Sequence, residues 1–230
     1  GAVFGILNGV DYSVWSPEAD ARIPFRYDVN HLELKEKNKQ ALLSRALLPA
    51  LPGVPLIGIV SRLSGQKGFD LLPDALALAL REGKIQLIVQ GSGERRFERL
   101  FHGLRARFAH QVRFQTKFDD TLAHQIQAAS DFFLMPSRYE PCGLTQLYAL
   151  KYGTVPIVRK TGGLSDTVQL WDPRAGTGTG IVFNDYNAQA VHWAMEAAFK
   201  RIAARDVQGL LALLAPLDGL AKGLGRDDPW

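Results

Sequence analysis

The sequence has 230 residues, enough for one large domain or two small ones, and its 27 lysine and arginine residues against 23 aspartate and glutamate residues give a net charge of +4. Hydrophobic residues make up 47% of the chain and charged residues 22%, which allows a sizeable buried core and excludes a chain that is disordered as a whole. The single cysteine excludes an internal disulfide framework and a cysteine-rich zinc site.

Short apolar runs alternate with helical patterns along the chain. A first helix is expected at about residues 35–48, ending before Pro49. Runs rich in β-branched and aromatic residues then predict buried strands at Val54–Ser61, Lys84–Gln90, Val112–Gln115, Phe132–Met135, Val155–Val158 and Gly180–Phe183. Helices are predicted between and after these strands at Lys67–Arg81, Glu94–Phe108, Leu122–Ala129, Leu144–Tyr152 and Asp185–Arg205. The apolar run Leu210–Leu217 predicts one more short helix.

This alternation predicts an α/β fold, a Rossmann-like parallel sheet with helices on both faces. In such a sheet, ligands bind at the carboxyl ends of the strands. The residues that directly follow each predicted strand are therefore the candidates for a functional site.

Two basic residues follow the first predicted strand. Arg62 and Lys67 flank a short turn that opens a helix. Two cations beside the N–H groups of a helix start suit a phosphate without a metal ion. Taken alone, the turn is better explained by solvated loop residues, and the run Gly91-Ser92-Gly93 after the second strand is explained by a tight turn.

Glu140 follows the fourth predicted strand, on the loop before a helix that begins around Gly143. A carboxylate here can accept hydrogen bonds from a polyol, although a helix-capping glutamate explains it equally well. Arg159 and Lys160 follow the fifth strand, before paired glycines, and again suit an anion. Because these turns share one edge of the sheet, together they predict a pocket for a phosphate-bearing polyol.

Membrane and nucleic-acid roles have little support. The longest run without a charged residue, Ala46–Ser61, has 16 residues and contains three prolines, whereas a spanning helix needs about 20 apolar residues. The isoelectric point of about 9.2 invites a nucleic-acid role, but the basic residues are scattered and an anionic small ligand explains the excess as well. We expect neither a membrane nor a nucleic acid as a partner.

Four stretches carry a resemblance to a known family. They are residues 5–11 with 15–18, residues 60–63 with 66–68, residues 136–152, and residues 159–168. The most specific is the run Glu140-Pro141-Cys142-Gly143-Leu144-Thr145-Gln146-Leu147-Tyr148. On these stretches the chain resembles the carboxyl-terminal half of bacterial glycogen synthases and plant starch synthases, which are retaining glucosyltransferases of the GT-B architecture.

The resemblance implies a reaction and its residues. Glucose would pass from ADP-glucose to the non-reducing end of an α-1,4-glucan, with no metal or other cofactor. Arg62 and Lys67 would stabilise the charge on the departing diphosphate, and Glu140 would hold the glucose hydroxyls. Further contacts with the donor are implied for Asn8, Phe118, Cys142, Gly143, Leu144, Thr145, Tyr148, Gly163 and Leu164. Among these, Phe118 would stack on the adenine, and Tyr148 stands where many GT-B transferases carry a glutamate that grips the ribose.

The resemblance also implies a domain organisation. Residues 1–20 are assigned to the entry from a hinge between domains, residues 21–205 to a nucleotide-sugar-binding domain, and residues 206–230 to a carboxyl-terminal tail. The chain begins with neither Met nor a basic leader. We therefore expect a fragment that lacks the amino-terminal GT-B domain and is inactive alone, since half of the reacting groups would be missing. The family implies the bacterial cytoplasm or the plastid stroma as the location.

Two other interpretations remain open. The chain could be a non-catalytic nucleotide- or glucan-binding module, or a related GT-B transferase that uses another nucleotide sugar. Metal binding by the five histidines is not expected, because they show no metal-ligand spacing. Cys142 is not expected to act as a nucleophile, because it has no evident neighbouring base. We expect a structural role for His124 and a core position for Trp193.

Overall fold

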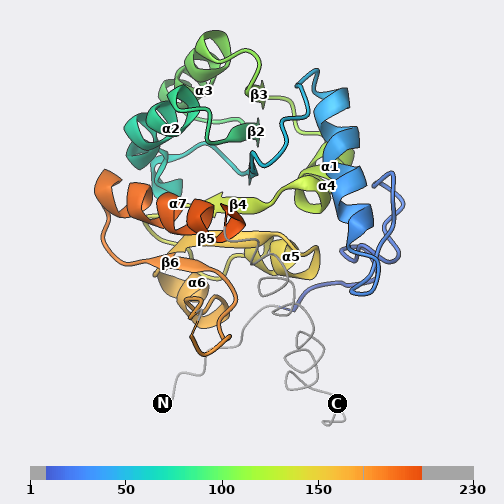
Figure 1. The fold of residues 1–230 in the computed structure, drawn as a ribbon. Coiled ribbons are helices and arrows are strands. Elements are labelled where there is room, and N and C mark those ends of the chain that lie inside the picture. Colours follow the sequence, from blue (N-terminus) through green and yellow to red (C-terminus); the bar gives the residue numbers. More distant parts are fainter. Residues whose placement is uncertain (1–8, 173, 204–230) are drawn as a thin grey trace, which may run out of the picture.

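Six parallel strands form the centre of the molecule, and helices cover both faces of the sheet (Figure 1). The computed structural model describes residues 9–172 and 174–203. The sheet order is β3-β2-β1-β4-β5-β6, and every neighbouring pair is parallel. The strands are β1 (Leu56–Val60), β2 (Gln86–Gln90), β3 (Val112–Gln115), β4 (Phe132–Met135), β5 (Val155–Arg159) and β6 (Ile181–Phe183). The predicted Rossmann-like fold is confirmed, and the strand order reverses between β1 and β4.

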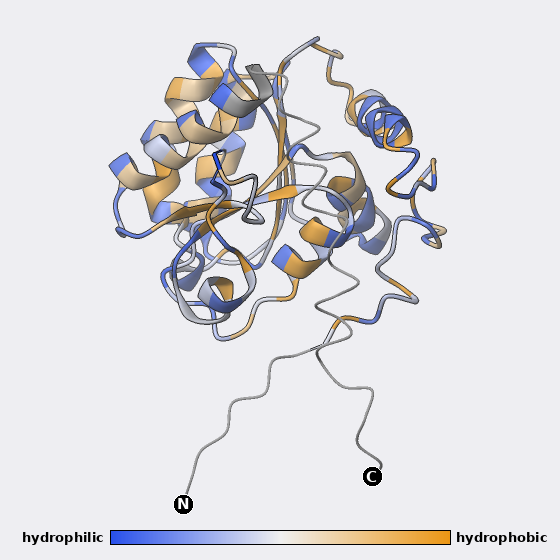
Figure 2. Ribbon diagram, turned by 60° about the horizontal axis from the view of Figure 1, so that its bottom comes forward, coloured by the Kyte–Doolittle hydropathy of each residue, from blue (hydrophilic) through white to orange (hydrophobic). Residues whose placement is uncertain are grey.

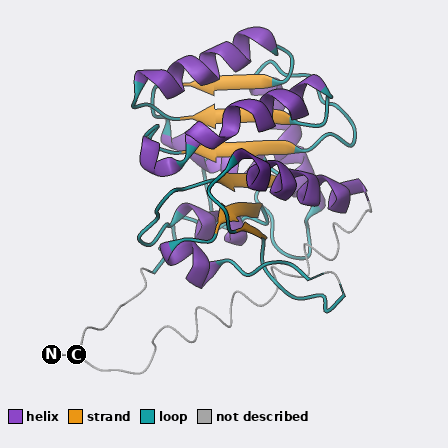
Figure 3. Ribbon diagram, turned by 90° about the vertical axis from the view of Figure 1, so that its left-hand side faces the viewer, coloured by secondary structure: helices purple, strands orange, loops and turns teal. Residues whose placement is uncertain are grey.

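The helices form a layer on each face of the sheet, as Figure 3 shows from the side. They are α1 (Glu33–Arg45), α2 (Leu72–Arg81), α3 (Arg95–Arg107), α4 (Asp120–Ala129), α5 (Thr145–Lys151), α6 (Gly162–Thr167) and α7 (Ala188–Ala203). One core cluster joins the sheet to α2, α3 and α7, and another joins it to α1, α4, α5 and α6. No helix in the described ranges is both long and apolar enough to span a membrane.

The alternation of side chains along β1 explains why both layers have a core. Ile57 and Ile59 pack into the cluster with α2, whereas Leu56 packs into the cluster with α4. Figure 2 shows hydrophobic residues along the strands and interleaved with polar residues on the flanking helices. Gly58 allows α4 to lie close, because a Cβ there would come within 2.4 Å of the Ser130 hydroxyl oxygen.

Some element boundaries differ from the sequence prediction. The helix expected from Lys67 begins only at Leu72, since Gly68 adopts a left-handed φ of 73° and the chain forms two short 3₁₀ turns, η1 (Gly65–Lys67) and η2 (Phe69–Leu71). The last helix begins at Ala188 because the Asn187 side chain caps it, accepting a 2.8 Å hydrogen bond from the amide of Ala190.

One further expectation is contradicted by the structure, and another lies outside the described residues. Trp193 was expected in the core, but its side chain is 52% exposed, so that prediction was wrong: its position on α7 turns outward while Val191, Ala194 and Met195 fill the core. The tail predicted for residues 206–230, with its short helix, lies outside the described residues, and so do residues 1–8 of the predicted hinge.

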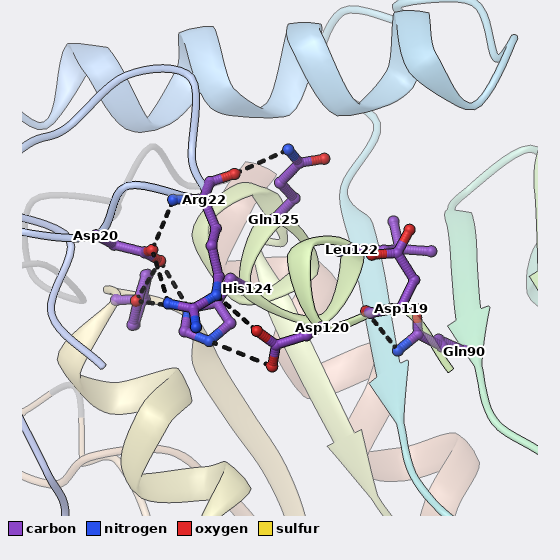
Figure 4. A network of polar contacts seen from close by, with 9 residues as sticks. Asp20, Arg22, Gln90, Asp119, Asp120, Leu122, His124 and Gln125 are labelled. Atoms are coloured by element: carbon purple, nitrogen blue, oxygen red, sulfur yellow. Dashed lines mark hydrogen bonds and ion pairs between the residues drawn. The ribbon is translucent and has the colours of Figure 1, made fainter. Parts of the chain in front are cut away.

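A buried polar network fastens the segment before α1 to α4 and α5 (Figure 4). The carboxylate of Asp20 accepts a 2.7 Å hydrogen bond from the Tyr152 hydroxyl and lies 2.7 Å from Nδ1 of His124. Burial by itself would raise the pKa of Asp20, but the hydrogen bonds from His124 and Tyr152 outweigh it and hold that pKa below its ordinary value. The structural role predicted for His124 is therefore confirmed.

Replacing Tyr152 by phenylalanine is expected to destabilise the fold by about 1–2 kcal/mol, because the buried Asp20 carboxylate then lacks one donor. Since the pKa of Asp20 is lowered by folding, its stabilisation is present above the unfolded pKa of about 3.9 and is lost as the pH falls through the folded pKa. The variant should raise the folded pKa, so its acid unfolding should begin at a higher pH. Urea unfolding at pH 7 and an acid titration measure both effects.

The matched control is Tyr139→Phe, since Tyr139 is 55% exposed and its hydroxyl has no hydrogen-bond partner among the described residues. This variant should unfold like the parent chain both in urea at pH 7 and in the acid titration. Equal stability of Tyr152→Phe and Tyr139→Phe would contradict the role assigned to the network.

Candidate functional site

The basic and acidic residues predicted after the strands come together at the carboxyl edge of the sheet. Arg62 follows β1, Lys67 ends η1, and Glu140 lies on the loop after β4. The ammonium of Lys67 forms an ion pair with Oε2 of Glu140, whose side chain is only 9% exposed. A cavity of about 150 Å³ opens beside this pair, and Arg62, Lys67 and Thr145 line it.

The loops that carry this pair are clamped to each other by backbone contacts. Gly68 places its Cα against the β4–α5 loop, where a Cβ would lie 1.9 Å from the carbonyl oxygen of Pro136. The carbonyl oxygen of Gln66 accepts a 2.9 Å hydrogen bond from the amide of Arg138, and the Gln66 side chain donates to the carbonyl of Tyr139. These contacts fix Lys67 opposite Glu140, although the two residues are far apart in the sequence.

The same loop packs against the start of α6. The amide of Gly163 donates a 3.0 Å hydrogen bond to the carbonyl of Glu140, and the amide of Leu164 donates to the carbonyl of Thr161. A Cβ on Gly163 would lie 2.2 Å from the carbonyl oxygen of Cys142. The structure therefore gives Gly163 a role in packing the Glu140 loop, whereas the Leu164 side chain lies in the core, and the contact of both residues with a donor stays a prediction.

The turn into α5 is held by a glutamine that the sequence analysis did not select. Nε2 of Gln146 donates to the carbonyls of Cys142 and Gly143, at 3.2 and 2.7 Å, and to the Thr167 hydroxyl. Gly143 adopts a φ of 67°, the left-handed region that favours glycine. Within the described residues, the amides of Gly143 and Leu144 donate no hydrogen bond. These amides are available to an anion near Thr145.

The remaining predicted residues are more scattered. Phe118 lies on the loop between β3 and α4 and is 67% exposed, so its ring is available for stacking. The ring of Tyr148 stacks on Trp15 at 3.9 Å, and Trp15 stacks in turn on His124 at 3.6 Å. Tyr148 thus packs the segment that carries Trp15 against α5. Its contact with a ribose stays a prediction. Asn8 lies outside the described residues.

Two residues near the pocket have roles that the sequence did not predict. Ser137 directly follows β4, lines the cavity, and places its hydroxyl 3.4 Å from Oε2 of Glu140. Its position just after a strand was the signal that could have identified it. Arg159 was predicted to suit an anion, but its guanidinium donates to the carbonyls of Arg138 and Asn184 and lies over the ring of Tyr186, so it braces the Glu140 loop.

The charges of the site suit a diphosphate joined to a sugar. Arg62 has no carboxylate partner among the described residues, so its guanidinium is free to bind an anion. Lys67 brings a second cation, and Glu140 brings the acceptor oxygens that sugar hydroxyls require. The described ranges contain no group of three or more histidine, cysteine, aspartate or glutamate residues that could hold a metal ion.

Comparison with known proteins gives the family. The family described as "Glycosyl transferases group 1" matches residues 45–206, which include the whole sheet and the loops that carry Arg62, Lys67 and Glu140. The chain belongs to this family. In this group 1 glycosyltransferase chain, the loops after β1 and β4 form the charged pocket described above.

Within the family, this group 1 chain is similar to glycogen synthases. It is 50% identical over 198 residues to a glycogen synthase of Kosmotoga olearia, covering 86% of this chain and 41% of the relative. It is 48% identical over all 230 residues to a glycogen synthase of Koribacter versatilis, covering 46% of that protein. The chain thus spans less than half of the length of the curated relatives it matches.

A solved structure resembles the group 1 chain closely. It is the catalytic domain of starch synthase IV from Arabidopsis thaliana bound to ADP and acarbose, with a TM-score of 0.83 and 34% sequence identity. The match covers 96% of this chain and 49% of the starch synthase chain. The GT-B fold implied by the sequence resemblance is therefore confirmed for this lobe.

Proposed function

We propose that this chain is the donor-binding half of a retaining glucosyltransferase that moves glucose from ADP-glucose to the non-reducing end of an α-1,4-glucan. One observation carries the proposal: Arg62 and Lys67 line one cavity on the carboxyl edge of the sheet, and Glu140 is paired with Lys67 beside it. The glycogen synthase relatives support the reaction, and the starch synthase structure with ADP and acarbose supports the donor base and the type of acceptor.

The proposed chemistry follows from the charges. The bond between glucose C1 and the β-phosphate oxygen breaks, and its electron pair stays on the departing ADP. The acceptor hydroxyl oxygen forms the new bond to C1 and gives its proton to the departing phosphate. Arg62 and Lys67 stabilise the negative charge that grows on the diphosphate. We propose that these two cations take the place of a metal ion.

Glu140 serves the sugar rather than the phosphates. Its buried carboxylate accepts hydrogen bonds from glucose hydroxyls, and the ion pair with Lys67 holds it in place. The pair thus couples the sugar end of the donor to its phosphate end. We propose that a further GT-B domain supplies the rest of the catalytic residues and the acceptor surface, so transfer needs more than the residues of this chain.

A calorimetric titration with ADP, and with UDP in parallel, tests the donor site. We expect saturable ADP binding that weakens about tenfold or more in Arg62→Ala, because a charge-assisted hydrogen bond to phosphate contributes about 1.5–3 kcal/mol. Arg81→Ala is the matched control, since Arg81 is exposed in the last turn of α2 and does not line the cavity. It should bind ADP like the parent chain.

Each outcome of the titration separates the interpretations. Tighter binding of UDP than of ADP would favour a transferase that uses another nucleotide sugar. Equal weakening by both substitutions would show that Arg62 has no special role. In a separate transfer assay, glucan elongation by this chain alone would contradict the need for a second domain.

A further inference from the structure

A larger cavity lies at the opposite edge of the sheet from the donor pocket. It has a volume of about 500 Å³ and lies between α1, the segment of residues 50–55 before β1, and the loops that enter β4 and β5. This size is within the usual range for small-molecule sites, roughly 300–1,000 Å³. None of the residues predicted for the donor site lines it. A ligand here would occupy a site separate from the proposed transfer chemistry.

Much of the cavity wall is apolar. Leu43 and Phe132 form part of its lining and are almost fully buried, whereas Leu51 is 36% exposed. Leu32 and Pro52 contribute further apolar surface. This lining favours the hydrocarbon part of a ligand, because its burial there removes apolar surface from water.

Two lysines of α1 reach into this cavity, and they differ in their partners. Lys39 is already paired with a carboxylate, since its ammonium lies 2.7 Å from Oδ2 of Asp131. The ammonium of Lys35 donates instead to two neutral oxygens, the carbonyl of Ala128 at 3.0 Å and the hydroxyl of Thr154 at 2.8 Å. Among the described residues, no carboxylate lies within ion-pair distance of Lys35. Its third N–H is left for a ligand.

The surroundings of Lys35 disfavour its charge. Burial lowers the pKa of Lys35 to about 7, Asp131 and Glu36 act in the opposite direction, and the neighbouring Lys39 lowers the pKa further. A half-buried cation whose hydrogen-bond partners are neutral is stabilised by an anion that reaches it.

We propose that the cavity binds a small amphiphilic carboxylate, whose anionic head pairs with Lys35 and whose hydrocarbon chain packs on the apolar wall. Charge complementarity selects a monoanion, because Asp131 already balances Lys39 and the Glu36 carboxylate in the lining would repel a second negative charge. A neutral hydrocarbon would leave the ammonium of Lys35 without a counter-charge.

Binding of such a ligand depends on pH in a defined direction. The carboxylate favours the charged form of Lys35, so binding raises the pKa of Lys35 and takes up a proton near pH 7 and above. Affinity is highest where Lys35 is charged and falls as the pH rises through that range. The ligand carboxylate stays ionised throughout, so it does not contribute to this change.

Titration calorimetry of this chain with octanoate tests the proposal, with octanamide as a neutral probe of the same length. We expect saturable binding of one octanoate, about tenfold or more tighter than octanamide at pH 6.5, with the difference shrinking at pH 8.5. Lys35→Met should weaken octanoate about tenfold and remove the pH dependence. Lys37→Met is the matched control, because Lys37 is on the same helix but lies near the ring of Phe25 and does not line the cavity.

Several results would overturn the proposal. They are the absence of saturable octanoate binding, equal affinity for octanamide at pH 6.5, and equal weakening by Lys35→Met and Lys37→Met. The probe comparison and the pH series use the parent chain, so they hold even if Lys35→Met fails to fold. ADP affinity, measured separately, should be the same in Lys35→Met and the parent chain, which distinguishes this site from the donor pocket.

Discussion

Replacing Lys67 by methionine is expected to destabilise the fold by about 3 kcal/mol, because it leaves the carboxylate of Glu140 buried without its cation. Glu140 is 7% exposed, and its remaining side-chain contact is a long 3.4 Å hydrogen bond from the Ser137 hydroxyl. No other cation of the described residues forms an ion pair with this carboxylate. Urea unfolding followed by circular dichroism at pH 7 measures the change.

A double variant separates the lost pair from the lost packing. In Lys67→Met combined with Glu140→Leu, both charges are removed, so most of the stability should return, since paired removal of buried ions is often close to neutral. ADP binding should not return, because a cation of the pocket is still missing. A single variant as stable as the parent, or a double variant no more stable than the single one, would show that the pair is effectively solvated.

Gly68→Ala is expected to destabilise the fold by about 4 kcal/mol and to abolish ADP binding. Two costs add here. The backbone φ of 73° strains any residue with a Cβ, at about 1–3 kcal/mol, and the new methyl group would lie 1.9 Å from the Pro136 carbonyl oxygen. That oxygen belongs to the backbone, so the loops must move apart, which costs about 1–3 kcal/mol more. The movement separates Lys67 from Glu140.

Gly83→Ala provides the control for the backbone strain. Gly83 has a similar φ of 67°, but no atom lies within 4 Å of the position that its Cβ would take. This variant should lose about 1 kcal/mol and keep the ADP affinity of the parent chain. Thermal unfolding and ADP calorimetry on both variants distinguish strain from collision. Similar losses in the two variants would show that the contact with Pro136 relaxes without cost.

Local patterns were enough to locate the elements and the edge that carries the site. Continuous apolar runs such as Phe132–Met135 are buried on both faces, and the structure places each such run in the parallel sheet. Because the strands are parallel, residues that follow them must share one edge, so Arg62 and Glu140 were predicted together before any contact was known. The boundary errors arose where a single residue overrides the pattern, as Gly68 does with its left-handed φ.

The individual contacts of the site depended on the tertiary structure. The pairing of Lys67 with Glu140 and the bracing role of Arg159 join residues distant in sequence, and neither periodicity nor motif spacing specifies such partners. The sequence also gave no sign of the cavity beside Lys35, since its lining residues are ordinary helix and loop residues brought together by α1 packing on the sheet. The sequence by itself determined the fold class, the edge of the sheet that holds the charged pocket and the resemblance to a family, because these follow from side-chain periodicity and short motifs. Only the tertiary structure decided which charges are paired, which amides already donate a hydrogen bond and where a second cavity opens. These features depend on long-range packing and on how far each polar group is removed from water.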